Sequence, residues 1–388
     1  MLLKPTISAI ALLATAIATE TLPLAAKAET SKDVVVKVGF ASPLTGAQAH
    51  LGKDNENGAQ LAVDEINATG LVVNGRRVRL ELISEDDAAD PRTGTQVAQK
   101  LVDDGVVAVV GHMNSGVAIP AARIYNEAHI ALLSTASNPS YTRLGYRSAF
   151  RLTATDANQG PALATYAHDV LKAKRVAVID DATAFGLGLA DEFSKAATRA
   201  GIGVISRDAT SDKSVDFRAI LTKIKAEKPD AIMFGGMDAT GGPLVRQAAA
   251  LGIAIPVLGG DGICTQTMID LTKQAAQNVI CTSVGAPLPS MPRGPMFSVV
   301  YEARFHAPVR FLAPFFYDGI YIVANAMRRA QSFNAPQVLA AIQSTNQDGV
   351  TGHFSYTAQG DITDPVVTVY TEHSGRFVPA TVLHMATH

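Results

Sequence analysis

The sequence predicts an α/β protein with two doubly wound, Rossmann-like lobes, and two observations lead to this fold class. The first is a strand–helix–strand pattern in which apolar runs at Val106–Val110 and Ile130–Leu133 flank a helical segment that ends near Ala128. Such a crossover places two strands parallel in one sheet. The second is that the same alternation of short apolar runs and helical segments recurs after Arg175. This alternation is typical of parallel sheets.

The first series of elements precedes residue 140. We expect strands at Val34–Phe40 and Val78–Ile83, a helix that ends at about Asn67, and another helix from about Pro91 to Val102. Proline is well tolerated in the first turn of a helix. The acidic turn Glu85–Asp87 follows the second of these strands, and we expect its carboxylates to accept hydrogen bonds from loop N–H groups.

The second series begins at Arg175. We expect strands at Val176–Ile179, Gly203–Ser206, Ala231–Phe234 and Pro256–Leu258, with helices to about Ala200, at Asp216–Ala226 and at Pro243–Leu251. A long apolar helix at Tyr317–Ala330 and strands after Thr363 complete the chain. The glycines of Gly186–Gly188 do not form a dinucleotide fingerprint, because they follow the strand too late and position 191 is Asp.

The first 28 residues are typical of a signal peptide. Lys4 is basic, Ile7–Ala18 is mostly apolar, and Ala26–Ala28 has the small residues of a cleavage site. A mostly apolar run of twelve residues is too short to span a bilayer. We therefore expect a soluble periplasmic protein cleaved after Ala28.

Composition and motifs exclude several functional classes. A formal net charge of −2 in 388 residues provides no basic field for nucleic acid. The chain contains neither a G-x-S-x-G nor an H-E-x-x-H motif, so we expect no enzyme, no metal site and no cofactor.

Cys264 and Cys281 are the only cysteines, and in an exported protein we expect them to form a disulfide.

Two serines follow the strands of the first pattern. Ser115 lies where a helix N-cap is expected, and Ser137 lies in the loop after the next strand. Both loops should emerge at the carboxyl edge of the sheet, where ligands bind in open α/β folds. Free N–H groups at the helix start favour a carboxylate or phosphate. The pattern alone also fits an ordinary helix cap at Ser115, and His112 beside it is interpreted as structural.

The order and spacing of several motifs resemble those of the periplasmic leucine-, isoleucine- and valine-binding proteins of ABC importers, which have the type I binding-protein fold. The resemblance covers the mature chain and rests on the motifs VKVGFASPLTG, GAQLAVDEINATG, EDDAADP, VGHMNSG, ARIYNEAHIALLSTASNP, FRLTATDANQGPALATY, FGLGLA, DFRAILTKIKAEKPDAIMFGG and LGGDG. It implies two lobes joined by three crossings, near Asp156, Gly285 and Asp364, with the ligand enclosed between them. Lobe 1 would comprise residues 29–156 and 286–364, and lobe 2 residues 157–285 and 365–388.

The resemblance also assigns ligand-binding residues. Ser115 would hold the ligand carboxylate together with the small residue Ala136 and the hydroxyl of Ser137. The resemblance leaves open whether Asn138 takes the place of Ser137 in this loop. Asp261 would face the ligand ammonium. Phe185 matches an aromatic position, and Leu51 and Met237 stand where several relatives have pocket-lining tyrosines.

The resemblance implies a solute-binding protein that captures an aliphatic or hydrophobic L-amino acid and delivers it to the membrane subunits of an ABC permease. We expect a monomer. Two alternatives stay open: an exported ligand-sensing module of the same fold and, with less support, a secreted α/β enzyme. Replacing tyrosines by Leu51 and Met237 makes the pocket less polar, which is compatible with leucine, isoleucine, valine, phenylalanine or a related aromatic acid.

Overall fold

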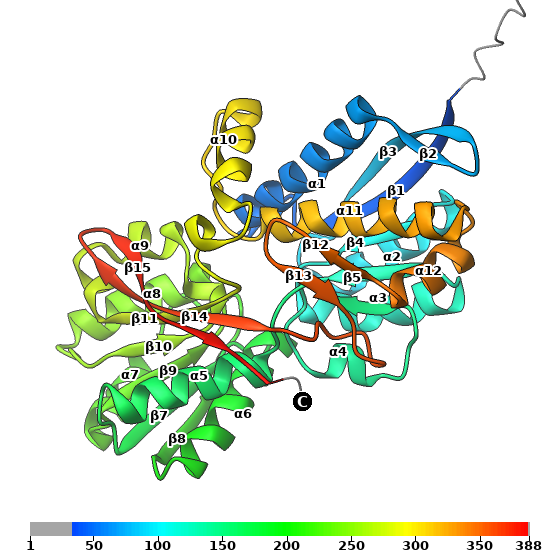
Figure 1. Cartoon of the computed structure of the whole chain (residues 1–388). Coiled ribbons are helices and arrows are strands. Elements are labelled where there is room, and N and C mark those ends of the chain that lie inside the picture. The colour runs from blue at the N-terminus through cyan, green and yellow to red at the C-terminus, as the bar shows by residue number, and fades with distance from the viewer. Residues whose placement is uncertain (1–32, 387–388) are drawn as a thin grey trace, which may run out of the picture. The chain divides into compact units, whose positions relative to one another are not determined.

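The computed structural model describes residues 33–386 and contains two large sheets (Figure 1). The proposed signal peptide lies outside the described residues. The first sheet has the strand order β2-β3-β1-β4-β5-β6. Its strands are β1 (Val34–Ser42), β2 (Leu71–Val73), β3 (Arg76–Asp86), β4 (Ala108–Gly111), β5 (Ala131–Ser134) and β6 (Ala149–Arg151). All neighbouring pairs are parallel except β2 with β3.

Helices cover both faces of this sheet. They are α1 (Ala49–Thr69), α2 (Pro91–Asp103), α3 (Ser115–Glu127), α4 (Ser140–Arg143), α11 (Ala313–Ala330) and α12 (Ala335–Gln343). A further helix, α10 (Gly294–Phe305), packs against α1 rather than against the sheet. Successive residues of β4 point to opposite faces: Val110 packs in the core that includes α1 and α11, and Val109 in the core of α2 and α3. The sheet is therefore doubly wound, as the sequence predicts.

The second sheet has the order β15-β14-β11-β10-β9-β7-β8. Its strands are β7 (Arg175–Asp180), β8 (Gly203–Ala209), β9 (Ala231–Gly235), β10 (Val257–Gly259), β11 (Val279–Val284), β14 (Val366–His373) and β15 (Arg376–His384). Its helices are α5 (Asp156–Asp169), α6 (Ala184–Arg199), α7 (Arg218–Glu227), α8 (Asp238–Ala250) and α9 (Gln266–Thr272). Val178 packs with α5 and α6, and Ile179 packs with α7 and α8. This sheet is doubly wound as well.

The chain passes between the sheets three times. It leaves the first sheet after β6, returns to it after β11 through α10 and α11, and joins the second sheet again at β14. Figure 1 shows β14, in red, beside the yellow-green β11, with which it pairs antiparallel. A small hairpin of β12 (Asn346–Asp348) and β13 (His353–Ser355) precedes the last passage, and 3-10 turns occur at η1 (Asp261–Ile263), η2 (Lys273–Asn278) and η3 (Leu288–Ser290).

Three local features differ from the sequence predictions. The hairpin of β2 and β3 was not predicted, although its turn residues Asn74 and Gly75 both have the positive φ that such tight turns require. Helix α8 begins at Asp238 rather than at Pro243, because the proline lies inside the helix instead of starting it. The N-cap of α3 is Asn114, so Ser115 is the first helical residue and not the cap.

Across residues 33–386, none of the helices combines the length and apolar character needed to cross a membrane.

Candidate functional site

A small cavity lies where the carboxyl ends of parallel strands from both sheets meet. Its walls come from the loops after β4, β5, β7, β9 and β10 and from the segment before α11. The lining residues are Met113, Asn114, Ser115, Thr135, Ser137, Phe185, Met237, Asp261, Gly262, Phe311 and Leu312. The structure thus brings five of the predicted ligand-binding residues to one cavity, at the edge where open α/β sheets bind ligands.

The first wall is rich in hydrogen-bond donors. Ser115 begins α3, and the side chain of the N-cap Asn114 makes no capping hydrogen bond. Its amide instead donates to Oε1 of Gln48 (2.8 Å). In the first turn of α3, the Val117 N–H donates to the Asn114 carbonyl (3.0 Å). The N–H groups of Ser115 and Gly116 have no partner within the helix, and the N-cap side chain does not bond to them. These N–H groups, together with the Ser115 hydroxyl, can therefore donate hydrogen bonds to a carboxylate.

The loop after β5 completes this wall. The backbone N–H of Asn138 donates to Oγ of Ser115 (3.2 Å), which joins the two loops. The side-chain amide of Asn138 donates to the carbonyl of Ala184 (2.6 Å), and Asn138 is not among the lining residues. Ser137 does line the cavity. The geometry therefore favours Ser137 over Asn138 as the hydroxyl-loop residue.

The opposite wall carries one carboxylate, that of Asp261 at the start of η1. Gln159 of α5 binds it twice: Nε2 donates to Oδ1 (3.2 Å), and Oε1 accepts the backbone N–H of Asp261 (3.1 Å). Oε1 also accepts the Thr282 hydroxyl (2.8 Å). Burial raises the pKa of the Asp261 carboxyl to about 6, and the hydrogen bond from Gln159 opposes this rise. Gln159 was not predicted as a site residue, although it lies within the recognised motif FRLTATDANQGPALATY.

Apolar side chains separate the two polar walls. Phe185 on α6 and Met237 before α8 come from the second lobe, and Phe311 and Leu312 come from the segment before α11. The last two were not predicted, because they follow no strand and belong to none of the recognised motifs.

Two predicted residues are elsewhere. Leu51 is fully buried in the core beneath α1, and Ala136 packs in the core beside α2 and α3. Neither lines the cavity. The adjacent Gly52 explains the close packing of α1, because a Cβ there would lie 1.9 Å from the carbonyl oxygen of Pro43.

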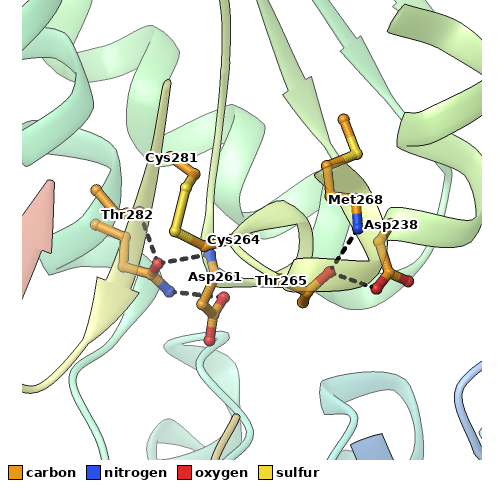
Figure 2. Close-up of a disulfide and its surroundings, with 8 residues drawn as sticks. Asp238, Asp261, Cys264, Thr265, Met268, Cys281 and Thr282 are labelled. Atoms are coloured by element: carbon orange, nitrogen blue, oxygen red, sulfur yellow. Dashed lines mark hydrogen bonds between the residues drawn. A yellow bond between two sulfur atoms is a disulfide. The ribbon is translucent and has the colours of Figure 1, made fainter. Parts of the chain in front are cut away.

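The lobes touch around the cavity. Besides the bond from Asn138 to Ala184, Nε2 of His50 on α1 lies 3.0 Å from Oδ2 of Asp238 on α8. The same Asp238 oxygen accepts the Thr265 hydroxyl (2.7 Å), as Figure 2 shows. The cavity measures only about 30 Å³. A solute can therefore enter only if the two walls move apart.

A disulfide joins Cys264 and Cys281, with their Cα atoms 5.3 Å apart. Figure 2 shows Asp261 beside this disulfide, on the turn that leads into Cys264. The bridge therefore ties the Asp261 turn to β11. Both cysteines of the sequence are paired.

His112 belongs to a buried network and not to the cavity. Its Nδ1 lies 2.7 Å from Oδ2 of Asp87, and its Nε2 lies 3.2 Å from the Tyr125 hydroxyl. Asp86 accepts the N–H groups of Leu44 and Ala88, both at 2.8 Å. These groups stabilise loops, in line with the sequence predictions. In the part of the chain that the structure describes, no cluster of His, Cys, Asp and Glu side chains could hold a metal ion.

Comparisons with known proteins identify the family. The model of the family described as "Periplasmic binding protein" matches residues 35–375. The Leu/Ile/Val-binding protein BraC3 of Rhizobium johnstonii is 33% identical over 348 residues, which cover 89% of this chain and 94% of the relative.

Solved structures of substrate-binding proteins superimpose on nearly the whole chain. The branched-chain amino acid transporter substrate-binding protein LivJ of Streptococcus pneumoniae, in complex with isoleucine, superimposes with a TM-score of 0.81 at 27% identity, covering 91% of this chain and 100% of LivJ. The leucine-binding protein LivK of Thermotoga maritima gives a TM-score of 0.83 at 26% identity, covering 90% and 98%. The sequence match, the two doubly wound sheets and the cavity between them together establish that the chain belongs to the periplasmic binding protein family, as a homologue of the Leu/Ile/Val-binding proteins, and that it is a binding protein rather than an enzyme.

Proposed function

We propose that this protein captures an aliphatic L-amino acid of the leucine, isoleucine and valine class in the inter-lobe cavity and delivers it to the membrane subunits of an ABC permease. It would act in the periplasm as a monomer, after cleavage of the signal peptide behind Ala28. The lobes would comprise residues 29–156 with 286–364 and residues 157–285 with 365–388, and would rotate about the three passages between the sheets.

One observation carries this proposal: the cavity has donors on one wall, a carboxylate on the other and apolar side chains between them. Ser115, Ser137 and the first turn of α3 suit a carboxylate. Asp261 suits an ammonium group. A zwitterion needs both complements, because an uncompensated charge taken out of water costs several kcal/mol.

The apolar walls indicate the side-chain class. Phe185, Met237 and Leu312 offer no hydrogen-bond partner to a polar ligand side chain. An aliphatic group gains free energy by leaving water for such a surface. The ligands printed in the names of BraC3 and LivJ support the same class.

Calorimetry on the mature chain with a set of matched ligands tests the proposal. L-leucine, L-isoleucine and L-valine should bind, whereas isoamylamine, which lacks the carboxylate of leucine, and isocaproate, which lacks its ammonium group, should each bind at least about a hundredfold more weakly. Binding of isocaproate as tight as that of leucine would show that the site takes carboxylates, and would contradict an amino-acid ligand.

A further inference from the structure

A second carboxyl group, that of Asp156, lies beside the proposed site. Asp156 is the first residue of α5, at the first passage from one sheet to the other. It is fully buried, and in residues 33–386 neither of its side-chain oxygens has a hydrogen-bond partner. Its backbone N–H donates to the carbonyl of Ser137 (2.8 Å), so the residue is attached directly to a cavity-lining loop.

Within the described residues 33–386, no salt bridge joins Asp156 to a cation. The charged groups that face it are Asp261 on η1, Arg151 on β6 and Glu192 on α6. Two of these are acidic. The Arg151 guanidinium forms its ion pair with Asp361 instead, because Nε donates to Oδ1 of Asp361 (2.7 Å). Its Nη2 donates to the carbonyl of Asn138 (3.2 Å), and its Nη1 is buried without a partner. Burial without an ion-pair partner disfavours the carboxylate, so the neutral form of this carboxyl group is favoured here.

The contact that covers Asp156 joins the two lobes. The Asn138 side chain reaches from the loop after β5 to the Ala184 carbonyl on α6. Gly188 of α6 lies so close that a Cβ there would be 2.9 Å from Oδ2 of Asp156 and 2.4 Å from Nδ2 of Asn138. Separation of the lobes breaks the Asn138–Ala184 bond and admits water to this carboxyl group.

We propose that Asp156 is a positioning residue of the ligand site that binds a proton when the lobes close on the amino acid, and that it acts on the ligand through the Ser137 loop. This inference rests on the proposed function. Capture of the amino acid is then coupled to the uptake of a proton by Asp156.

The direction of the pH dependence follows from the environment of Asp156. In the closed structure, burial raises the pKa of Asp156 to about 8. The neighbouring Asp261 charge assists this rise, and the nearby Ser137 hydroxyl and Arg151 charge oppose it. A solvated aspartate has a pKa of about 3.9. Between these values the closed state binds up to one more proton than the open state, so affinity should fall with rising pH by up to about tenfold per pH unit. Asp261 does not cancel this effect, because the ligand ammonium group keeps it ionised.

The test is calorimetric titration with L-leucine between about pH 5 and about pH 8, repeated in phosphate and in Tris, whose ionisation enthalpies differ. The wild-type protein should take up close to one proton near neutral pH. Asp156→Asn should bind with a nearly pH-independent affinity and without proton uptake. The matched control is Asp181→Asn, at a buried carboxyl group within the second lobe whose Oδ2 is also unpartnered, and it should retain the pH slope.

Proton uptake of about zero in the wild-type protein with tight leucine binding would overturn the inference and leave the proposed function intact. This measurement needs no variant, so it stands even if Asp156→Asn fails to fold. An unchanged slope in a folded Asp156→Asn protein would also overturn the inference. If none of the three branched-chain amino acids binds at any pH, the proposed function fails and the inference fails with it.

Discussion

Gln159 holds Asp261 at two points, the carboxylate and the backbone N–H, through the two ends of a single amide group. The two residues lie 102 positions apart in the sequence and on different elements, α5 and η1. The amide thereby fixes both the position of the turn and the direction of the carboxylate that we propose for the ligand ammonium group.

We expect Gln159→Leu to weaken L-leucine binding by about 1.5–3 kcal/mol, the range for a lost hydrogen bond to a charged group. Titration calorimetry measures this change. Gln60→Leu is the matched control, because Gln60 also donates to a carboxylate, Oδ1 of Asp64 (2.7 Å), but on α1 and outside the cavity lining. Equal affinities of the Gln159 and Gln60 variants for L-leucine would show that binding does not depend on the hydrogen bonds from Gln159 to Asp261.

Asp261→Ala should weaken binding by roughly 2–5 kcal/mol, because it leaves the ligand ammonium group buried without its partner. Folding should survive, since the residue lies on a turn between two glycines and does not belong to the apolar cores. Calorimetry gives the affinity, and thermal unfolding checks the fold. An affinity within threefold of wild type would mean that the ammonium group is held elsewhere.

Gly188→Ala should impair closure without destabilising the second lobe. A Cβ at this position would lie 2.4 Å from Nδ2 of Asn138, on the opposite side of the inter-lobe contact. Alanine in a helix interior is otherwise more favourable than glycine by about 0.5–1 kcal/mol. We therefore expect an unchanged or higher unfolding temperature together with at least about tenfold weaker binding of L-leucine.

Solution scattering provides the second measurement for this variant. Saturating leucine should reduce the radius of gyration of the wild-type protein, because hinge closure brings the lobes together, and this reduction should be smaller in Gly188→Ala. Gly203→Ala serves as the control, since its nearest neighbour would be an ordinary contact of 3.5 Å with the Lys174 carbonyl oxygen. Full compaction of the Gly188 variant would contradict the role of this contact in closure.

Replacement of both Cys264 and Cys281 by serine should lower the free energy of unfolding by about 3 kcal/mol, the value of the chain-entropy model for a loop of this size. Denaturant unfolding measures the difference. Titration of the unfolded, non-reduced wild-type protein should find no free thiol. Two free thiols would show that the bridge is not formed in the isolated protein.

Much of the fold was predictable from local sequence patterns. Short apolar runs alternating with helical segments specify parallel sheets, because the crossover fixes the direction of each returning strand. The same rule places Ser115 and Ser137 on neighbouring loops at one sheet edge, where the structure has them. The resemblance added Phe185, Met237 and Asp261, which line the cavity, and also Leu51 and Ala136, which do not.

What the sequence by itself determined is the set of elements, the direction of most strands and the loops that could carry a ligand, because these depend on residues that are close together in the chain. Only the tertiary structure decided that Gln159 supports Asp261, that Phe311 and Leu312 complete the apolar wall, and that β14 extends the second sheet. It also decided that the Asp156 carboxyl group is buried without a hydrogen-bond partner. Each of these relations joins residues that lie far apart in the sequence, and no local pattern records such a pairing, because it arises only when the separate elements pack against one another.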